Sequence, residues 1–426
     1  AYTWYTPGTA AWGLDRASKN YYINKAIPRA LQARVTAVAN NGATLTLDKS
    51  AAVPVSGANV YLDVAPILNF LVGTDNWYKF GGAPGELRTL VPSNMRTPMP
   101  AGSYAIGGAI IIGSSRSNNV LYGQGSSTTM LFSPKGVPSA SIWLNGTNNM
   151  VRDLRLVGNT GMNGYGIAWP TTVVPWGYGP LGLEVKYTSP GGAEVTDTLV
   201  PQGYGWPYGI RMYGANLTVQ DAKVDNVWQG AVAASYCYNC WAYRVENTQT
   251  DPLQNYIQWQ FMWSDAAGGG CVDCIVNSKW LIAGFSIVKG NGVQFIRPKG
   301  VNATFEVNSS GNFLYQDPET VIKPMSQSPS FVSNSYIMNI NSNMDNALPV
   351  DQRDKRNAAG GKIINPRFIV EGPINSNNNG LSAFAIGYWT PNITIQGGYY
   401  EGPNWQSPST INTPVGVISQ GTSTIV

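Results

Sequence analysis

Short hydrophobic runs separated by turn residues characterise the chain between Pro100 and Leu131. The stretch reads as a Pro-Ala-Gly turn, a β-branched run, a turn rich in Ser and Asn, a second run, a Gly-x-Gly element and a third run. Runs this short, bounded this closely by turn residues, leave no room for helices between them. The pattern predicts an all-β protein built from successive short strands.

A six-residue pattern recurs farther along the chain, with apolar residues at its first, fourth and sixth places. Its clearest copies are Val151–Leu156, Val219–Val224 and Cys240–Val245, looser copies begin at Cys274 and Val293, and later coils are expected at Ile363–Ile369 and Asn392–Glu401. A strand, a two-residue bend and a new strand would produce this spacing. The five copies start 19 to 68 residues apart, which favours a solenoid whose insertions are confined to its loops.

The stretch from Pro100 to Leu131 also resembles the first full coil of the pectate-lyase-like right-handed parallel β-helix superfamily. In that family a P-x-G-x-Y strand precedes a v-x-L-x-G-x-G-s-x-T-x-l element, and here Pro100-Ala-Gly-Ser-Tyr104 precedes Val120 to Leu131. The resemblance implies a single-stranded right-handed parallel β-helix, in a group of polysaccharide lyases, polysaccharide hydrolases and phage tailspikes. The functional signatures of those enzymes are absent, so the resemblance assigns no catalytic residue.

The chain is predicted to divide into a cap, a solenoid and a tail. Residues 1–95 are expected to form an N-terminal β-rich cap, because two alternating strands flank the hairpin signal Asn40-Asn41-Gly42 and an open solenoid end exposes strand edges. Residues 96–401 would form the β-helix, with an aromatic insertion at about 160–207. Residues 402–426 would be a C-terminal tail that covers the other end or lies along a neighbouring subunit.

Composition narrows the class of protein. Charged residues make up 12% of the chain, which has 14 Trp, 23 Tyr and a net charge of +4. The aromatic content excludes a disordered chain, the small charge gives no support for nucleic-acid binding, and no apolar run is long enough for a membrane span. Histidine is absent, which excludes Ser-His, Cys-His and His-ligated metal chemistry. The start at Ala1 and five Asn-x-Ser/Thr triplets favour a secreted, extracellular protein.

The fifth place of the repeat carries a series of basic side chains. Its occupants include Arg155, Lys223, Arg244 and Arg297. Equivalent residues of a parallel β-helix stack about 4.8 Å apart, so these cations would form a row suited to an acidic polysaccharide. The 68-residue gap between the first two copies predicts one extra coil between Arg155 and Lys223. The alternative is internal pairing, because Asp225 and Glu246 lie two residues beyond Lys223 and Arg244 and point the same way. Exposed pairs of that kind are worth about 0–1 kcal/mol.

Two reactions that need no histidine are open to these residues. Elimination on a uronic acid needs cations near the substrate carboxylate and a basic side chain to take a proton. Glycoside hydrolysis needs two carboxyl groups about 5–9.5 Å apart, which Asp225 and Glu246 would supply. We therefore predict, without cofactor or metal, the catalytic residues Lys223, Arg244, Asp225 and Glu246 and the substrate-binding residues Arg155 and Arg297.

Aromatic residues are concentrated in the insertion and in the long coil that follows. The candidates for substrate contact are Trp169, Trp176, Tyr178, Trp206 and Trp259. Aromatic side chains on stiff loops would stack on sugar rings, and they would equally well pack against a second subunit, since they cost little entropy to hold. Both interpretations remain open at this point.

The four cysteines form two C-x-x-C motifs, Cys237 with Cys240 and Cys271 with Cys274. Stacked on adjacent coils, the motifs would place Cys237 over Cys271 and Cys240 over Cys274, within disulfide range. Two such disulfides would also suit a secreted protein. Free buried thiols and a metal site are the alternatives, although the spacing between the motifs exceeds that of common zinc sites.

Two functional hypotheses follow from these features. In the first, a secreted β-helix binds an extracellular acidic polysaccharide and depolymerises it. In the second, the chain is a non-catalytic structural subunit of an extracellular filament, sheath or spike. Both allow a homo-oligomer, as a trimer or a fibre, and neither requires nucleic acid, a membrane span or a cofactor.

Overall fold

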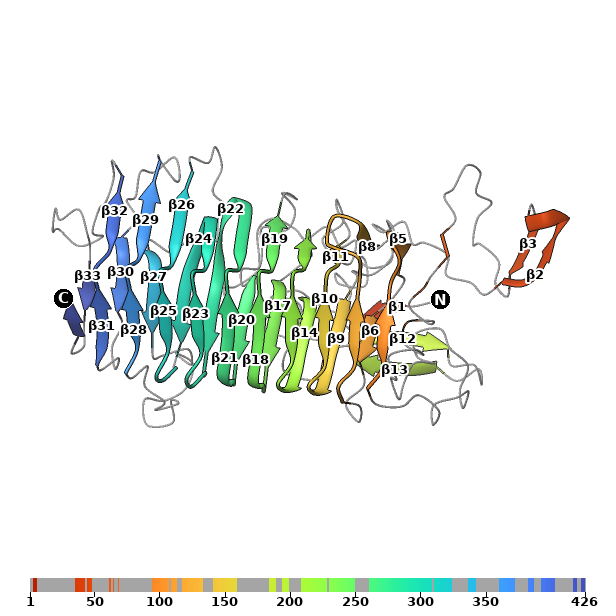
Figure 1. Ribbon diagram of the computed structural model, residues 1–426, viewed down its shortest axis with the longest axis horizontal. Helices are drawn as coiled ribbons and strands as arrows, with labels where there is room; N and C mark the ends of the chain where they lie inside the picture. The colour runs from red at the N-terminus through yellow and green to blue at the C-terminus, as the bar shows by residue number, and fades with distance from the viewer. Residues whose placement is uncertain are drawn as a thin grey trace.

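The computed structural model is an elongated all-β solenoid (Figure 1). It describes most of residues 94–158, 208–323 and 360–371, shorter pieces between and after these ranges, and a few segments of residues 1–93. One 29-stranded sheet contains the solenoid, and each of its strands pairs in parallel with a strand of the next coil. The chain is therefore a parallel β-helix, as the sequence predicts.

Each coil contributes a strand to three faces. Face 1 consists of β4 (Arg96–Pro98), β7 (Val120–Tyr122), β10 (Met150–Arg152), β15 (Thr218–Gln220), β18 (Tyr238–Tyr243), β21 (Ala267–Val272), β23 (Gln294–Ile296), β25 (Leu314–Gln316), β28 (Lys362–Ile364), β31 (Ile393–Gln396) and β34 (Ser423–Ile425). Face 2 consists of β5 (Gly102–Ala105), β8 (Thr129–Phe132), β11 (Arg155–Val157), β16 (Lys223–Asp225), β19 (Glu246–Gln249), the first parts of β22 (Ile275–Val288) and β24 (Lys299–Asn308), β26 (Glu319–Ile322), β29 (Arg367–Val370) and β32 (Tyr399–Glu401).

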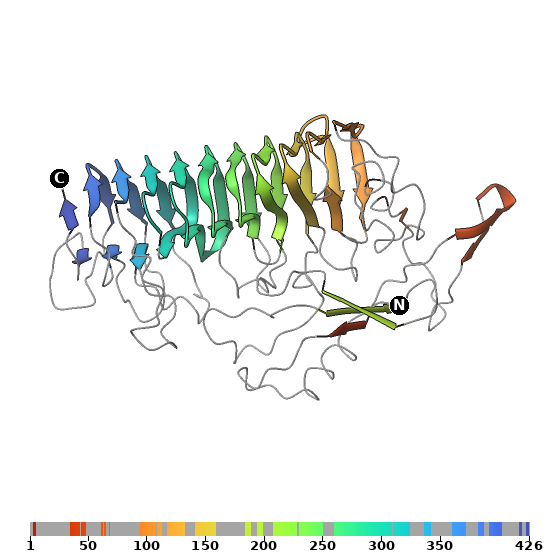
Figure 2. The same cartoon turned by 90° about the horizontal axis from the view of Figure 1, so that it is seen from below.

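Face 3 completes the coil. Figure 2 shows the successive coils in a row along the long axis of the solenoid. Face 3 consists of β6 (Ala109–Ile112), β9 (Ser141–Thr147), β14 (Tyr208–Ala215), β17 (Gly230–Ser235), β20 (Phe261–Ser264), the second parts of β22 and β24, β27 (Tyr336–Asn341), β30 (Ser382–Ile386) and β33 (Val417–Ser419). Strands β33 and β34 pair in parallel with β30 and β31. The segment predicted as a C-terminal tail thus adds strands to the solenoid.

The remaining strands lie outside this sheet. Strands β1 (Thr3–Tyr5), β12 (Glu184–Thr188) and β13 (Glu194–Thr198) form an antiparallel sheet. The hairpin predicted around Asn40-Asn41-Gly42 is present as β2 (Val35–Ala39) and β3 (Thr44–Leu47). Val64 donates its backbone N–H to the carbonyl of Ala105, and the buried Leu68 joins the core. A cap over the first coil stays a prediction for the rest of residues 1–95.

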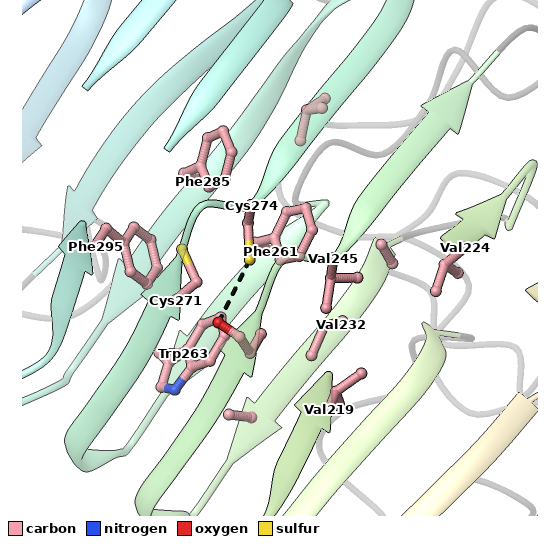
Figure 3. Packing of buried hydrophobic residues seen from close by; sticks show 14 of the residues in the cluster. Val219, Val224, Val232, Val245, Phe261, Trp263, Cys271, Cys274, Phe285 and Phe295 are labelled. Carbon is pink, nitrogen blue, oxygen red and sulfur yellow. Dashed lines mark hydrogen bonds between the residues drawn. The ribbon is translucent and has the colours of Figure 1, made fainter. Parts of the chain in front are cut away.

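The core lies between the three faces, where alternate side chains of each strand point inward. Phe261, Phe285 and Phe305 stack from coil to coil with ring centroids 5.2 and 5.5 Å apart, and Phe368 continues the stack 5.8 Å from Phe305. Figure 3 shows the start of this stack beside Phe295. Each such pair adds about 0.5–1.5 kcal/mol beyond the burial of its area. The coils are therefore held together along the axis by aromatic contacts.

Single residues with left-handed backbone conformation turn the chain from face 1 to face 2. We call this edge the polar corner; its residues, with φ between 48° and 55°, are Asp153, Asp221, Arg244, Asp273, Arg297, Asp317 and Asn365. Asp and Asn tolerate this conformation, whereas for other residues it costs about 1–2 kcal/mol. The basic members of the polar corner therefore need a compensating interaction, which the acidic members above them supply.

Asparagines mark the opposite edge, where face 3 turns into face 1. Asn118 donates a side-chain hydrogen bond to Asn94 (2.8 Å), Asn148 donates to Asn118 (3.1 Å), and Asn239 donates to Asn216 (3.0 Å). All five have positive φ. Their amides satisfy one another along the axis, so the edge is polar without being charged.

The observed register confirms one part of the sequence alignment and corrects another. Arg155 and Lys223 occupy equivalent positions, as predicted, but they pair directly with each other, so the extra coil expected between them is absent. Lys223 pairs with Glu246, however, and Val219 pairs with Ala242 instead of Cys240. The predicted alignment of the Cys240 copy was therefore wrong by two residues. A slip of two leaves inward side chains inward, so the hydrophobic pattern cannot reveal it.

The four cysteines are buried free thiols, which overturns the predicted disulfides 237–271 and 240–274. The reason is the register between the coils, because Cys240 pairs with Gly269, five residues before the expected Cys274, and Cys271 pairs with Ala242, five residues beyond the expected Cys237. Figure 3 shows Cys271 and Cys274 packed among aromatic side chains. The Cys274 thiol donates to the carbonyl of Ala242 (3.5 Å). Burial raises the pKa of the Cys237 and Cys271 thiols, so both are protonated at neutral pH.

Candidate functional site

Four of the predicted charged residues lie together on the outer surface of face 2. Arg155 on β11, Lys223 on β16 and Glu246 on β19 follow one another in a column from coil to coil. Asp225 lies two residues beyond Lys223 on the same strand and therefore points to the same side. We call these four residues the face-2 cluster.

Asp225 is the buried member of the face-2 cluster. Its side chain is only 2% exposed and accepts hydrogen bonds from Arg155 Nε (2.7 Å) and the Thr248 backbone N–H (3.2 Å). Burial raises the pKa of the Asp225 carboxyl and outweighs the opposing attraction of Arg155 and Lys223, while the charge of Glu246 raises it further. The carboxyl thus holds its proton more tightly than an ordinary aspartate.

Glu246 stands in different surroundings on the next strand. Its carboxylate accepts a hydrogen bond from Lys223 Nζ at 2.8 Å and one from the Thr248 hydroxyl at 3.4 Å. The Glu246 side chain is 41% exposed. The cluster therefore combines a buried carboxyl group of raised pKa with a neighbouring solvent-accessible carboxylate, each held by its own cation.

Arg244 and Arg297 lie elsewhere, at the polar corner. Arg244 donates to Asp221 at 2.6 and 2.8 Å, and Arg297 donates to Asp273 at the same two distances. These guanidinium groups lower the pKa of Asp221 and Asp273. Acidic and basic residues alternate along this corner from Asp221 to Asp317, so the expected row of four cations along one face was wrong, and the alternative of internal pairing describes the structure.

The aromatic candidates of the sequence analysis, Trp169, Trp176, Tyr178, Trp206 and Trp259, lie outside the residues that the structure describes. The described coils carry a different aromatic group that the sequence analysis missed. It extends from the turn of face 3 into face 1 along β18 to the polar corner and consists of Tyr213, Tyr236, Tyr238, Trp241 and Tyr243. The signal was the series Tyr-Cys-Tyr-x-x-Trp-x-Tyr in residues 236–243, whose polar-side positions are unusually aromatic.

Among the residues that the structure describes, no helix has the length and hydrophobicity needed to cross a bilayer. No three Cys, Asp or Glu side chains of these residues converge as a set of metal ligands.

The chain matches no family model and no curated protein, but it is similar to solved structures. The catalytic domain of a GH87 α-1,3-glucanase in complex with tetrasaccharides is 11% identical over 77% of this chain (TM-score 0.39), and ORF18 of Geobacillus virus E2 is 11% identical over 90% (TM-score 0.42). This chain spans 64% and 66% of those two proteins, just under two thirds of each. DFA-IIIase from Arthrobacter chlorophenolicus A6 is 10% identical over 86% of this chain and 92% of its own (TM-score 0.41).

Proposed function

We propose that this protein hydrolyses a polysaccharide at the face-2 cluster, with Asp225 as proton donor and Glu246 as the second carboxylate. One observation carries the proposal: two carboxyl groups on neighbouring strands face the same side in unlike environments. In glycosidases, two carboxyl groups in unlike environments divide the roles of acid and base. The resemblance of residues 100–131 to a polysaccharide-acting superfamily supports the choice of substrate class.

The spacing of the pair suits this chemistry. Asp225 and Glu246 differ by one strand across the face and by two residues along it, which separates their Cα atoms by about 8 Å. Inverting glycosidases need carboxyl groups about 6.5–9.5 Å apart, because a water molecule lies between the base and the sugar, and Cα atoms at this separation allow the two side chains to reach that range. The raised pKa of Asp225 favours its protonated form, which suits a donor to the leaving oxygen, and Glu246 would activate the water.

The two cations of the face-2 cluster have supporting roles in this proposal. Lys223 Nζ donates a hydrogen bond to Glu246 Oε1 at 2.8 Å and so orients the carboxylate. Arg155 orients the Asp225 carboxyl through its Nε and Nη2 atoms. Because both cations already contact carboxylates, we propose a neutral polysaccharide in place of the acidic one that the sequence suggested. An extracellular location and assembly into a homo-oligomer complete the proposal.

The experiment incubates the protein with neutral glucans and galactans and with acidic alginate and polygalacturonate, and follows reducing ends. We expect Asp225→Asn and Glu246→Gln each to lower the hydrolysis rate at least about a hundredfold, the usual effect of losing a general acid or base. Asp273→Asn is the matched control, because Asp273 has a similar arginine partner at 2.6 Å but lies at the polar corner. It should retain full activity.

Three results would overturn the proposal. Unsaturated products that absorb ultraviolet light would assign the reaction to elimination. An equal loss in Asp273→Asn would show that ion pairs act only on stability. A folded protein that releases no sugar from any substrate, and that forms fibres in negative-stain micrographs, would instead support the structural subunit of a filament, sheath or spike.

A further inference from the structure

Five aromatic side chains on two adjacent coils form an exposed group away from the face-2 cluster. Tyr213 lies on β14, Tyr236 follows β17, and Tyr238, Trp241 and Tyr243 lie on β18. Tyr213, Tyr236 and Tyr238 are 47%, 51% and 64% exposed. We call this group the aromatic corner, since it begins at the turn from face 3 into face 1 and continues along β18.

The rings of the aromatic corner hold one another in place. The Tyr213 and Tyr236 ring centroids are 6.0 Å apart at an interplanar angle of 63°, and those of Trp241 and Tyr243 are 5.7 Å apart at 19°. The indole N–H of Trp241 donates to Asn239 Oδ1 at 2.8 Å. Restrained aromatic rings present a large contact area at low entropic cost, so the group is organised before any ligand arrives.

Tyr236 has an unusual backbone conformation at this exposed position. Tyr236 has φ 50°, a left-handed conformation that is a genuine outlier for a bulky side chain. The equivalent residue of the next coil is Asp265, which adopts this conformation at little cost, and the one after that is Lys289. Strained residues cluster at functional sites, and the exposed Tyr236 is a candidate for one.

A glycine-rich stretch of β21 (Gly268–Gly270) lies next to these rings. Tyr238 pairs with Ala267 and Trp241 pairs with Gly270 on the following coil. Between them, a Cβ atom placed on Gly268 would meet no heavy atom within 4 Å. The rings thus border open space above a backbone surface, where a ligand ring can approach closely.

The surroundings of the aromatic corner are polar. Asn239 and Asn216 form the amide ladder beside it. Asp265 occupies the position of Tyr236 on the next coil, and Arg244 and Asp221 form an ion pair at the polar corner. Aromatic faces edged by polar groups match sugar rings, which have apolar C–H faces and hydroxyl edges.

We propose that the aromatic corner is a binding site for a neutral glycan, whose sugar rings stack on Tyr236, Tyr238 and Trp241. A second copy of the chain fits less well. Three tyrosines that are about half exposed offer on the order of 300 Å², whereas a stable interface needs about 800 Å² from each partner. The site extends the proposed function to a second contact with the polysaccharide, and it does not require cleavage at Asp225.

Binding is measured by affinity electrophoresis in gels containing dextran, laminarin or alginate, with all variants made in the Glu246→Gln background so that the polymer stays intact. We expect retardation by at least one neutral glucan, and an apparent Kd at least about tenfold weaker for Tyr236→Ala and for Tyr238→Ala. Tyr399→Ala is the matched control, because Tyr399 is 51% exposed on β32 at the far end of the solenoid. It should bind as the parent does.

The outcomes separate this site from the proposed reaction. Retardation that survives the double variant Tyr236→Ala with Tyr238→Ala, or that falls equally in Tyr399→Ala, would overturn the binding site whether or not the parent chain cleaves glycans. Retardation by alginate alone would overturn the neutral class. A lower assembly mass in light scattering for the double variant, with unchanged glycan binding, would assign the aromatic corner to self-association instead. Circular dichroism verifies that each variant is folded.

Discussion

Burial raises the pKa of the Asp225 carboxyl and outweighs the effect of its ion pair with Arg155, which would lower it. Arg155 contacts the Asp225 carboxyl at 2.6 and 2.7 Å, a geometry that usually lowers an acid's pKa. Asp273 has comparable contacts with Arg297, is 40% exposed, and has a lowered pKa. Asp225 is 2% exposed and has a raised pKa. The two residues share their chemistry and differ in solvent, so burial accounts for the opposite directions.

This contrast predicts opposite pH dependences of stability. The folded pKa of Asp225 lies above its unfolded value of about 4, so its contribution is fully present below that pH and is lost as pH rises through the folded pKa. The folded pKa of Asp273 lies below its unfolded value, so its contribution is present above about pH 4 and is lost on acidification. Denaturation midpoints of Asp225→Asn and Asp273→Asn between acidic and neutral pH measure both.

Wild type should lose stability relative to Asp225→Asn as the pH rises, and should gain it relative to Asp273→Asn. The second difference should stay below about 1 kcal/mol, because the Asp273 pair is exposed and screened by solvent. Added salt should shrink it further. Parallel curves for the two variants would show that the pKa of Asp225 is not raised in the folded protein.

Strand β21 illustrates how one element fits between its neighbours. It contains Gly269 and Gly270 where the strands on either side carry larger residues, and it pairs with β18 above and β23 below. A Cβ atom on Gly270 would overlap the backbone carbonyl of Gln294, whereas one on Gly268 would meet open space. Gly270 is therefore required by the close approach of the β23 backbone, whereas Gly268 is favoured only by its positive φ.

We predict that Gly270→Ala destabilises the protein by about 3 kcal/mol, as a backbone clash in a buried strand does. Gly268→Ala should cost about 1 kcal/mol, because its φ of 64° is unfavourable for alanine but its side chain meets nothing. Denaturant unfolding of the two variants measures the difference. Equal losses would mean that strain in the backbone, and not contact with β23, governs both positions.

The elements also show what sequence alone can establish here. Alternation of polar and apolar residues identified the coils and the equivalent positions of Arg155 and Lys223, since both depend on which side chains face inward, but it did not show that these two residues pair directly. The same alternation is blind to a slip of two residues, which moved Arg244 to the polar corner, and a five-residue error in aligning the Cys274 copy separated the paired cysteines. The burial of Asp225 and the grouping of aromatic residues from β14 and β18 depend on contacts between coils, which no local pattern encodes.

The solenoid as a whole is stabilised by contacts between nearest coils. Phe305 contacts Phe285, Tyr315 and Phe368 through ring centroids 5.5, 5.6 and 5.8 Å apart, near the middle of the aromatic stack. Phe384 contacts Phe368 and Tyr400 close to the C-terminal end. In a quasi-one-dimensional fold, stability is approximately a sum of such interfaces. A destabilising substitution should therefore lower the stability mainly of the coils next to it.

Truncation of these two rings tests that expectation. Phe305→Ala should cost about 3–5 kcal/mol, as for other buried phenylalanines, and hydrogen exchange should accelerate in β22, β24 and β27 on both sides of it. Phe384→Ala should accelerate exchange only in the last coils, β27 to β34, because the end of a solenoid opens without disturbing its middle. Strands β7 to β11 are the internal reference in both variants. Faster exchange there in Phe384→Ala would show that the coils unfold as one cooperative unit, in which case the face-2 cluster would be sensitive to damage anywhere along the axis.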